Sequence, residues 1–296
     1  MKLCLGTVQF GLDYGIQGNK QPKEEKVFEM LSFAIDSGIT MLDTASAYGE
    51  AEELLGKYFR AFPEKKSAVG IVSKLKPDAF AETDTGDWAE IAVQNARKSL
   101  ERIGVSKLEA YLFHNASFIF DINAVHALNE VKRTGLAERI GVSVYSPDEA
   151  MKALDYPEIG VIQIPYNLFD HRLDKCGFFE KAKEQGVIVF ARSSLLQGLI
   201  MMDPDNLPDK VRFAKEYLIK LHRICNLYHI DLLDIAVDYV GSKDGIDYVV
   251  FGVDDLMQLK QYLSLSKDRL PEEIMALLES TFQEVEERLV NPVLWR

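Results

Sequence analysis

The chain has 296 residues and carries 34 Lys and Arg against 46 Asp and Glu, so its formal net charge at pH 7 is −12. This charge disfavours nucleic acid and anionic membranes as partners, because both bind basic surfaces. With 47% hydrophobic and 27% charged residues the composition is that of a folded globular protein, long enough for one α/β barrel with additions or for two small domains.

Taken in chain order, the sequence alternates short apolar runs with longer amphipathic segments. The apolar runs predict eight strands, at residues 3–7, 39–43, 68–74, 109–114, 139–144, 160–165, 187–192 and 247–252. The amphipathic segments predict helices at 23–37, 50–60, 87–103, 121–134, 147–154 and 176–185. A longer helical insertion follows at 209–241, and Pro271 with the two glutamates after it begins an extra carboxyl-terminal helix.

A glycine marks many junctions between a predicted helix and the next strand: Gly38, Gly104, Gly135, Gly186 and Gly245. Glycine adopts the left-handed conformation that ends a helix. Strands that alternate with helices imply right-handed crossovers and a parallel sheet buried on both faces, and eight such units close most naturally into a barrel. We therefore predict a single (β/α)8 TIM barrel domain over residues 1–296, with an open doubly wound sheet as the alternative.

The chain carries no sign of a disulfide framework, a metal site or a membrane span. Its three cysteines, Cys4, Cys176 and Cys225, are an odd number and lie far apart. The longest uncharged runs have eleven residues, whereas a spanning helix needs about 17–25. The amino terminus has the pattern of a first strand and not of a signal peptide. We expect a reduced, cytoplasmic protein that is a monomer or a weak dimer, since it has no heptad pattern.

Polar residues end most of the predicted strands. They are Asp43, Lys74, His114, Ser143, Gln163 and Arg192. In a (β/α)8 barrel the carboxyl ends of the strands meet at one mouth, where the chemistry is built. Each residue alone also has an ordinary explanation, because polar side chains favour the solvated end of a strand.

Four residues together suggest proton-transfer chemistry. Asp43, Lys74 and His114 follow three successive strands, and Tyr48 lies five residues after Asp43. An adjacent cation lowers the pKa of a phenol, and a carboxylate would hold the lysine charged. Such a tyrosine can protonate the oxyanion that forms at a carbonyl, while a histidine orients that carbonyl by a hydrogen bond. The alternatives are an aromatic packed under a helix for Tyr48 and a helix cap for Asp43.

Eight blocks, in order over almost the whole chain, resemble the aldo-keto reductase family. They are LGTVQFG, LDTASAYGEAEELLG, IVSKL, YLFHN, IGVSVY, IQIPYN, RSSLLQGL and VVFGVDDLMQL. In that family these blocks are the strand ends of a (β/α)8 barrel that binds a nicotinamide cofactor. The resemblance implies that Tyr48 is the general acid, with Asp43, Lys74 and His114 as its partners.

The resemblance also implies the residues that hold the nicotinamide. Ser143 and Gln163 would bind its carboxamide, although Val144 stands where the family often has an asparagine. Arg192, followed by Ser193, stands where many members place an aromatic that stacks on the nicotinamide. A planar guanidinium can stack as well.

The resemblance places the adenosine ribose near Gly252, Val253, Asp254 and Asp255. Family members that take the phosphorylated dinucleotide usually carry Ser, Lys or Arg here, whereas a carboxylate repels a 2′-phosphate and suits a free ribose hydroxyl. Either aspartate could instead cap the helix that follows, and the two roles are compatible. The cofactor is accordingly NADPH or NADH, with NADH favoured more than is usual in the family.

The expected substrate pocket is apolar and aromatic with one amide, from Gln9, Tyr14, Phe118 and Phe120. This lining suits an aldehyde, a small ketone or a sugar carbonyl, so the leading prediction is an NAD(P)H-dependent reductase of a small-molecule carbonyl. One alternative is a cofactor-binding regulatory or partner-binding subunit with little turnover. Another is a Schiff-base aldolase or lyase in which Lys74 is the nucleophile.

Overall fold

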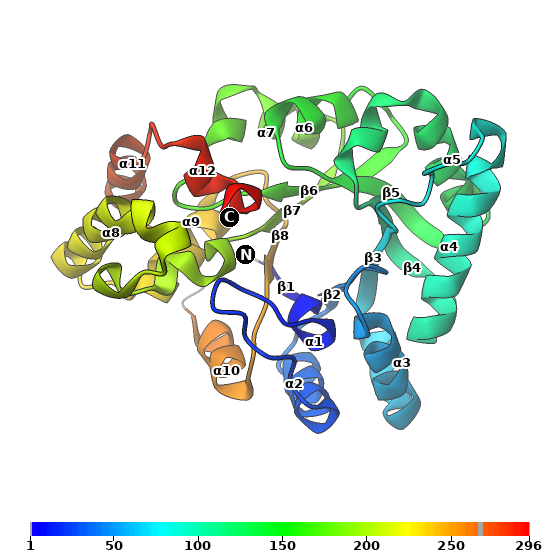
Figure 1. Ribbon diagram of the computed structural model, residues 1–296, viewed down its shortest axis with the longest axis horizontal. Helices are drawn as coiled ribbons and strands as arrows, with labels where there is room; N and C mark the ends of the chain where they lie inside the picture. Colours follow the sequence, from blue (N-terminus) through cyan, green and yellow to red (C-terminus); the bar gives the residue numbers. More distant parts are fainter. Residues whose placement is uncertain (1, 266–268, 296) are drawn as a thin grey trace.

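A closed barrel of eight parallel strands forms the centre of the protein (Figure 1). The computed structural model describes residues 2–265 and 269–295. The strands are β1 (Lys2–Gly6), β2 (Met41–Asp43), β3 (Gly70–Leu75), β4 (Leu108–Phe113), β5 (Ala137–Ser143), β6 (Ile159–Pro165), β7 (Ile188–Arg192) and β8 (Tyr248–Phe251). They pair in chain order, and β1 pairs with β8 to close the barrel. The predicted (β/α)8 fold is confirmed.

Helices surround the barrel and connect its strands (Figure 1). They are α2 (Glu24–Asp36), α3 (Ala51–Ala61), α4 (Trp88–Ile103), α5 (Ile122–Arg133), α6 (Pro147–Ala153), α7 (Phe178–Glu184) and α10 (Leu256–Ser264). The five junction glycines named from the sequence all have positive φ angles, from 68° to 94°. At Gly38, Gly104, Gly135 and Gly186 a left-handed glycine follows the end of the helix as predicted. Gly245 instead lies three residues beyond Ser242, the last residue of the preceding helix, whose cap Lys243 is extended.

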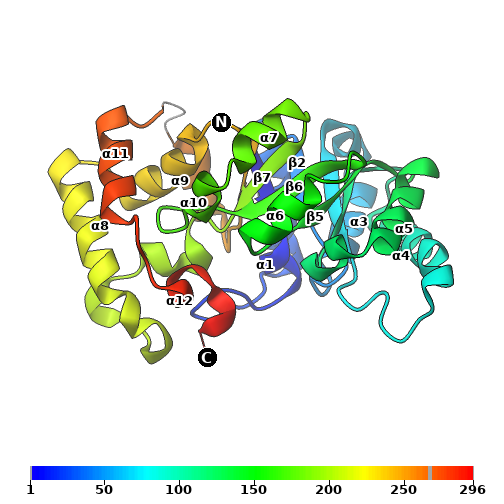
Figure 2. The same cartoon turned by 90° about the horizontal axis from the view of Figure 1, so that it is seen from above.

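The predicted insertion at 209–241 forms two α-helices, α8 (Lys215–Tyr228) and α9 (Leu232–Ser242). His229 ends α8 in the left-handed conformation, with φ 54°. The carboxyl-terminal helix begins after Pro271 as expected but divides into α11 (Glu272–Thr281) and α12 (Glu287–Val290). Figures 1 and 2 show α11 beside α8, and the Tyr228 hydroxyl donates to Glu273 at 3.0 Å.

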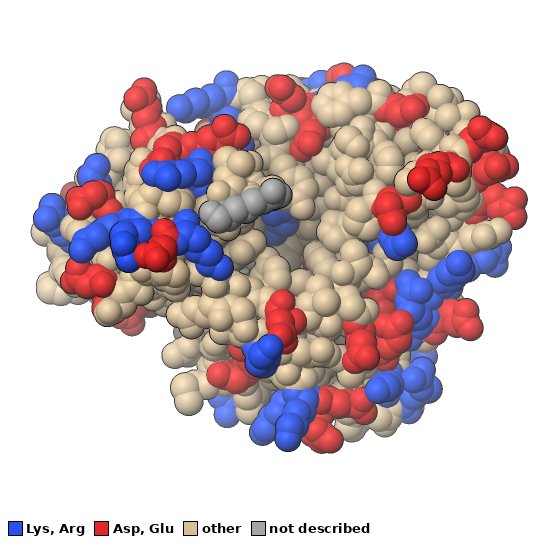
Figure 3. All heavy atoms as spheres, in the orientation of Figure 1, with Lys and Arg blue, Asp and Glu red and all other residues tan. Residues whose placement is uncertain are grey.

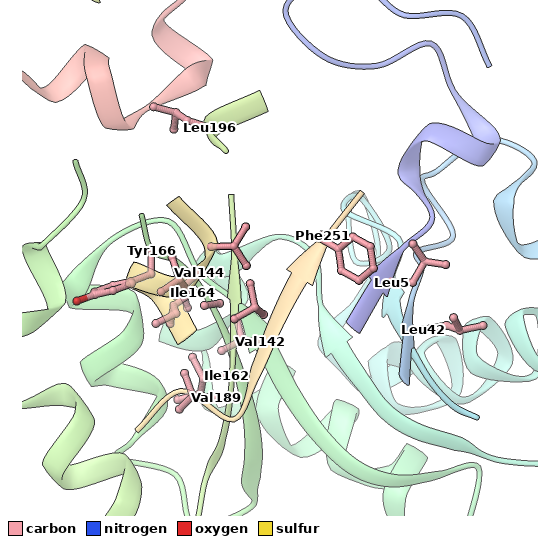
Figure 4. Close-up of a cluster of buried hydrophobic side chains, with 14 of the residues drawn as sticks. Leu5, Leu42, Val142, Val144, Ile162, Ile164, Tyr166, Val189, Leu196 and Phe251 are labelled. Carbon is pink, nitrogen blue, oxygen red and sulfur yellow. The ribbon is translucent and has the colours of Figure 1, made fainter. Parts of the chain in front are cut away.

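Side chains alternate between the two faces of the barrel wall. The outward set packs under the helices, and Figure 4 shows part of it, including Leu5, Val142, Ile162 and Phe251. A smaller apolar cluster fills the interior: Cys4, Met41, Val72, Ala110, Leu112, Val161 and Phe190. Two residues beyond five of these interior positions stand Asp43, Lys74, His114, Gln163 and Arg192. The period of two therefore directs these polar residues inward at the mouth.

Two elements near the amino terminus were not predicted. A one-turn helix, α1 (Val8–Gly11), follows β1 directly. After it the chain turns back on itself, with Tyr14 and Asn19 paired in an antiparallel bridge. We call residues 12–20 the β1 strap.

The face that carries the mouth is hollowed near its middle (Figure 3). Uncharged atoms form most of the surface around this hollow, and the acidic and basic side chains lie mainly toward the periphery. Across residues 2–265 and 269–295, no helix combines the length and apolar character needed to span a membrane. The same residues contain no cluster of three or more His, Cys, Asp or Glu suited to hold a metal.

Candidate active site

A cavity of about 870 Å³ lies at the carboxyl ends of the strands. Most of the residues that the sequence singled out line it: Gln9, Tyr14, Asp43, Tyr48, His114, Ser143, Gln163, Arg192, Ser193, Gly252 and Asp254. Its volume falls in the range of about 300–1,000 Å³ typical of sites for small molecules and cofactors. The barrel thus brings residues from both ends of the chain to one chamber.

Asp43 lines the floor of this cavity and forms a buried ion pair with Lys74, which supports the floor without itself lining the cavity. The Lys74 ammonium donates to the two carboxylate oxygens of Asp43 at 2.7 and 2.9 Å and to the Thr44 carbonyl at 2.9 Å. Burial lowers the pKa of Lys74, but Asp43 and Tyr48 together raise it above its ordinary value. Lys74 is therefore a charged group, and its three donors have three acceptors.

A chain of hydrogen bonds extends from Asp43 across the floor. The Gln163 amide donates to Asp43 Oδ1 at 2.8 Å, and the Ser143 hydroxyl donates to Gln163 Oε1 at 3.1 Å. All three side chains are buried. These bonds fix the orientation of the Gln163 amide and leave one of its N–H groups and the Ser143 oxygen for a ligand.

Tyr48 lies on the turn between β2 and α3, and α1 holds that turn in place. Gly49 has φ 52°, and a Cβ at Gly49 would overlap the Gly11 carbonyl. A Cβ at Gly11 would in turn overlap the Tyr48 carbonyl. Only glycine at both positions lets the two backbones approach so closely. The position of the Tyr48 ring therefore depends on a backbone contact with α1.

The Tyr48 ring contacts two of its predicted partners. Its centroid lies 4.9 Å from the Lys74 ammonium. It lies 5.5 Å from the centroid of the His114 ring, and the planes of the two rings are 88° apart. Phenol, imidazole and ammonium therefore form one cluster, above the Asp43 carboxylate.

The sequence led us to expect that Lys74 lowers the pKa of Tyr48, and the net direction is the opposite. Burial raises the pKa of Tyr48 above its ordinary value, while Lys74 acts to lower it. The correction has a simple cause, because loss of hydration disfavours the phenolate more than the nearby cation favours it. Tyr48 is consequently protonated at neutral pH, which is the form that can donate a proton.

His114 is neutral in this site. Burial, together with the charges of Lys74 and Arg192, lowers the pKa of His114 to about 3. A neutral imidazole has one N–H donor and one acceptor nitrogen. The buried Nδ1 atom has no hydrogen-bond partner among the residues that the structure describes. The ring thus retains hydrogen-bonding capacity for a ligand.

Arg192 is the last residue of β7 and lines the cavity on the side of the barrel across from β3, the strand that carries Lys74. Its guanidinium donates to the Val144 carbonyl at 2.8 Å and to the Ser193 hydroxyl at 3.3 Å. It also lies over the Tyr145 ring, 4.5 Å from the centroid. Tyr145 ends the block IGVSVY, but the sequence analysis gave it no role.

The two neighbouring aspartates after β8 have different surroundings. Asp255 caps α10, since its carboxylate accepts from the Gln258 backbone N–H at 2.8 Å. Asp254 lines the cavity and accepts from the Asn19 side chain at 2.7 Å. Val253 is fully buried in the hydrophobic core and does not line the cavity. The sequence left both roles open for both aspartates; the structure shows the cap at Asp255, and the cofactor role stays a prediction.

The side-chain amide of Gln9 packs against the backbone of Gly252. A Cβ at this position would overlap the Gln9 side chain. The Gln9 Oε1 atom is buried and has no hydrogen-bond partner within the described part of the chain. Gln9, predicted as a substrate contact, thus lies beside the residues predicted to hold the cofactor.

The β1 strap crosses from its own strand to the loops after β7 and β8. The Ile16 N–H donates to the Gln197 carbonyl at 3.3 Å, and Asn19 bonds Asp254. Three residues of the loop after β7, namely Ser193, Leu196 and Gln197, have φ angles between 51° and 67°. The rim of the cavity is therefore a set of loops joined by few hydrogen bonds.

Two predicted pocket residues lie elsewhere. Phe118 packs against Phe80 and Phe113, with centroid distances of 4.9 and 5.6 Å, and Phe120 is 55% exposed. The cause is local, because Asn115 caps a 3-10 turn over Ala116–Phe120 that carries both rings away from the mouth. Other residues line the cavity without having been predicted, among them Met201, Asn291 and Val293.

Comparisons with known proteins agree with this architecture. The model of the aldo/keto reductase family matches residues 2–282. This match covers nearly the whole barrel. The chain belongs to the aldo-keto reductase family, and its relatives in that family are oxidoreductases.

Individual relatives are distant but span most of the chain. The NADH-specific methylglyoxal reductase of Escherichia coli (strain K12) is 24% identical over 253 residues, covering 76% of this chain and 77% of that protein. The aldo-keto reductase YhdN of Bacillus subtilis (strain 168) is 25% identical over 290 residues, covering 88% and 86%. A crystal structure of the thermostable aldo-keto reductase Tm1743 with the inhibitor epalrestat is 26% identical, with TM-score 0.69 and 94% of each chain covered.

Proposed function

We propose that this aldo-keto reductase reduces a small-molecule aldehyde, ketone or sugar carbonyl to an alcohol with a reduced nicotinamide cofactor, and that Tyr48 is the general acid. One observation carries the proposal. Within a cavity of suitable size, the protonated phenol of Tyr48 contacts both the neutral His114 ring and the Lys74–Asp43 ion pair. This cluster can donate a proton from Tyr48 to a bound carbonyl and stabilise the phenolate that remains.

Each of these side chains has a distinct task in the proposed reaction. Tyr48 gives its proton to the carbonyl oxygen as negative charge develops there. Lys74 stabilises the phenolate that remains, and Asp43 keeps Lys74 charged and oriented. His114 donates a hydrogen bond that orients the carbonyl oxygen. The reduced nicotinamide, when bound, supplies the hydride.

The lining of the cavity fits a nicotinamide cofactor. Ser143 and Gln163 present a hydroxyl oxygen and an amide N–H, which complement a carboxamide. At the other end, the unpartnered Gln9 oxygen lies against Gly252. We assign Ser143, Gln163, Arg192 and Ser193 to the nicotinamide side of the site and the Gly252 loop to the ribose side.

The carboxylate of Asp254 supports a preference for NADH. It lines the cavity, and no cation forms an ion pair with it among residues 2–265 and 269–295. A carboxylate can accept from a free ribose hydroxyl but repels a 2′-phosphate. The Escherichia coli relative bears the name of an NADH-specific enzyme that reduces methylglyoxal, a small carbonyl compound.

The Schiff-base alternative is weakened by the surroundings of Lys74. A nucleophilic lysine needs a neutral amine that reaches its substrate. The Lys74 side chain is fully buried, does not line the cavity and has a raised pKa. The alternative of a regulatory subunit with little turnover is left as an outcome of the experiment below.

The proposal is tested by titrating NADH and NADPH into the protein, with quenching of its fluorescence as the signal, and then measuring cofactor oxidation with a panel of carbonyl compounds. Tyr48→Phe removes the proton donor and keeps the shape, so we expect turnover to fall about 10²–10⁴-fold with cofactor affinity little changed. Near wild-type turnover in this variant would overturn the role of Tyr48. Tight cofactor binding without turnover on any carbonyl would favour the regulatory alternative.

A further inference from the structure

Arg192 is a cation in the cavity wall that lacks a carboxylate partner. No ion pair joins it to any acidic side chain within residues 2–265 and 269–295, and two neutral oxygens, of Val144 and Ser193, accept its hydrogen bonds. The other cation near the catalytic cluster, Lys74, is neutralised by Asp43. Among the described residues that line this cavity, Arg192 is therefore the cation without an ion-pair partner.

Two contacts fix the position of the planar guanidinium of Arg192. The Tyr145 ring lies 4.5 Å from its central carbon, and the Val144 carbonyl fixes one edge at 2.8 Å. A guanidinium stacks through either of its two faces. Tyr145 supports the guanidinium at 4.5 Å from its ring centroid, and because Arg192 also lines the cavity, we take the guanidinium to be accessible to a planar ligand there.

Arg192 lines the same cavity as Tyr48 and His114, the two residues proposed to face the reacting carbonyl. Its charge contributes to the lowered pKa of His114 and opposes the raised pKa of Tyr48, so it acts on both residues that face the reacting carbonyl. A nicotinamide ring must lie within contact distance of that carbonyl to transfer hydride to it. A ring in this part of the cavity is therefore close to the Arg192 charge.

We propose that Arg192, supported by Tyr145, makes the protein bind the reduced cofactor more tightly than the oxidised cofactor. This inference rests on the proposed function, because it takes the nicotinamide to occupy this chamber. The reduced ring is neutral and rich in electrons, and a stacked cation attracts it. The oxidised ring carries one positive charge, which the unpaired guanidinium repels. An uncharged aromatic in this position would lack that repulsion.

The test measures dissociation constants for NADH and NAD⁺, and for NADPH and NADP⁺, by calorimetric titration without substrate. In Arg192→Gln and Arg192→Met, which are neutral, we expect the ratio of the oxidised to the reduced dissociation constant to fall about tenfold. In Arg192→Lys, which keeps the charge, the ratio should stay within about twofold of wild type. Lys260→Gln is the control, since it removes a cation that lies over Phe33, away from the cavity.

The outcomes separate the inference from the function on which it rests. If the wild type binds both redox forms and the two neutral variants keep its ratio, the inference is overturned and the proposed function stands. If Lys260→Gln changes the ratio as much as Arg192→Gln, net charge is the cause and the role of Arg192 is likewise overturned. If the wild type binds no nicotinamide cofactor, the proposed function itself fails.

Discussion

The floor and the rim of the cavity are built in contrasting ways. At the floor, Asp43, Lys74 and Gln163 come from three strands and are buried and hydrogen-bonded to one another. At the rim, the β1 strap and the loop after β7 are joined by single hydrogen bonds, and Gln197 has φ 56°. Barrel register fixes the first set, whereas a few loop contacts fix the second. Substitutions at the floor should therefore alter stability and chemistry together, and those of rim residues that line the cavity should alter recognition with little effect on stability.

Lys74→Met gives the largest expected effect, and it tests the floor. Removing the ammonium leaves the Asp43 carboxylate buried without a counter-charge, so the free energy of unfolding should fall by about 3–5 kcal/mol, and turnover should be lost. Urea denaturation and a turnover assay measure both effects. Adding Asp43→Asn to Lys74→Met should restore much of the stability but none of the turnover. Equal stability of wild type and Lys74→Met would contradict a floor held by this pair.

The pH dependence of stability tests the neutral His114. Burial lowers its pKa from about 6.5 in the unfolded chain to about 3, so the unfolded state binds more protons between these values. Stability consequently falls as pH drops below about 6.5, by about 2 kcal/mol at pH 5 from this residue. His114→Gln should lose that part of the slope, as chemical denaturation at pH 5 and pH 7 would measure. An unchanged slope would mean that His114 ionises normally.

The rim is tested at Asp254, which lines the cavity and accepts a hydrogen bond from the β1 strap. Asp254→Ser removes the carboxylate that faces the cavity, so NADPH should bind about tenfold more tightly with little change for NADH. Asn19→Ala is the control, because it breaks the same hydrogen bond of the strap and keeps the charge. Fluorescence titration measures both cofactors. NADPH affinity that is indifferent to Asp254→Ser would show that this carboxylate does not face the 2′-position.

Asp255→Ala should give the smallest effect. Loss of the cap of α10 should lower the free energy of unfolding by about 1 kcal/mol and leave both cofactor affinities unchanged. Thermal or urea unfolding gives the first quantity and titration the second. A change in cofactor affinity comparable to that of Asp254→Ser would remove the distinction between the two aspartates.

Sequence reasoning reached the fold and the floor because both follow local rules. Alternation of apolar residues along a strand predicts that Asp43 and Gln163 point inward, and a glycine such as Gly104 ends its helix by its own conformation. The rim escaped prediction, since the bond between Asn19 and Asp254 joins loops whose residues carry no periodic pattern. Phe118 was misplaced because a short 3-10 turn, set by one side-chain cap, redirects it.

The pKa of Tyr48 shows a different limit of prediction from sequence, because the sequence does not give the extent of burial. Sequence order identifies Lys74 as its neighbour, so the direction of the electrostatic effect could be foreseen. The extent of burial depends on the packing of α1, the cavity wall and His114, which no single segment specifies. Burial turned out to be the larger influence.

The close approach of the backbones at Gly11 and Gly49 couples two positions that are far apart in the sequence, because a side chain at either one would collide with the other segment. A methyl group at either position is admissible only if the opposite backbone withdraws, and that withdrawal displaces the turn that carries Tyr48. We therefore expect that neither glycine can be replaced without a shift of the backbone at the other position. A substitution in the one-turn helix α1 can therefore move Tyr48, the proposed general acid, although α1 itself supplies no group to the proposed reaction.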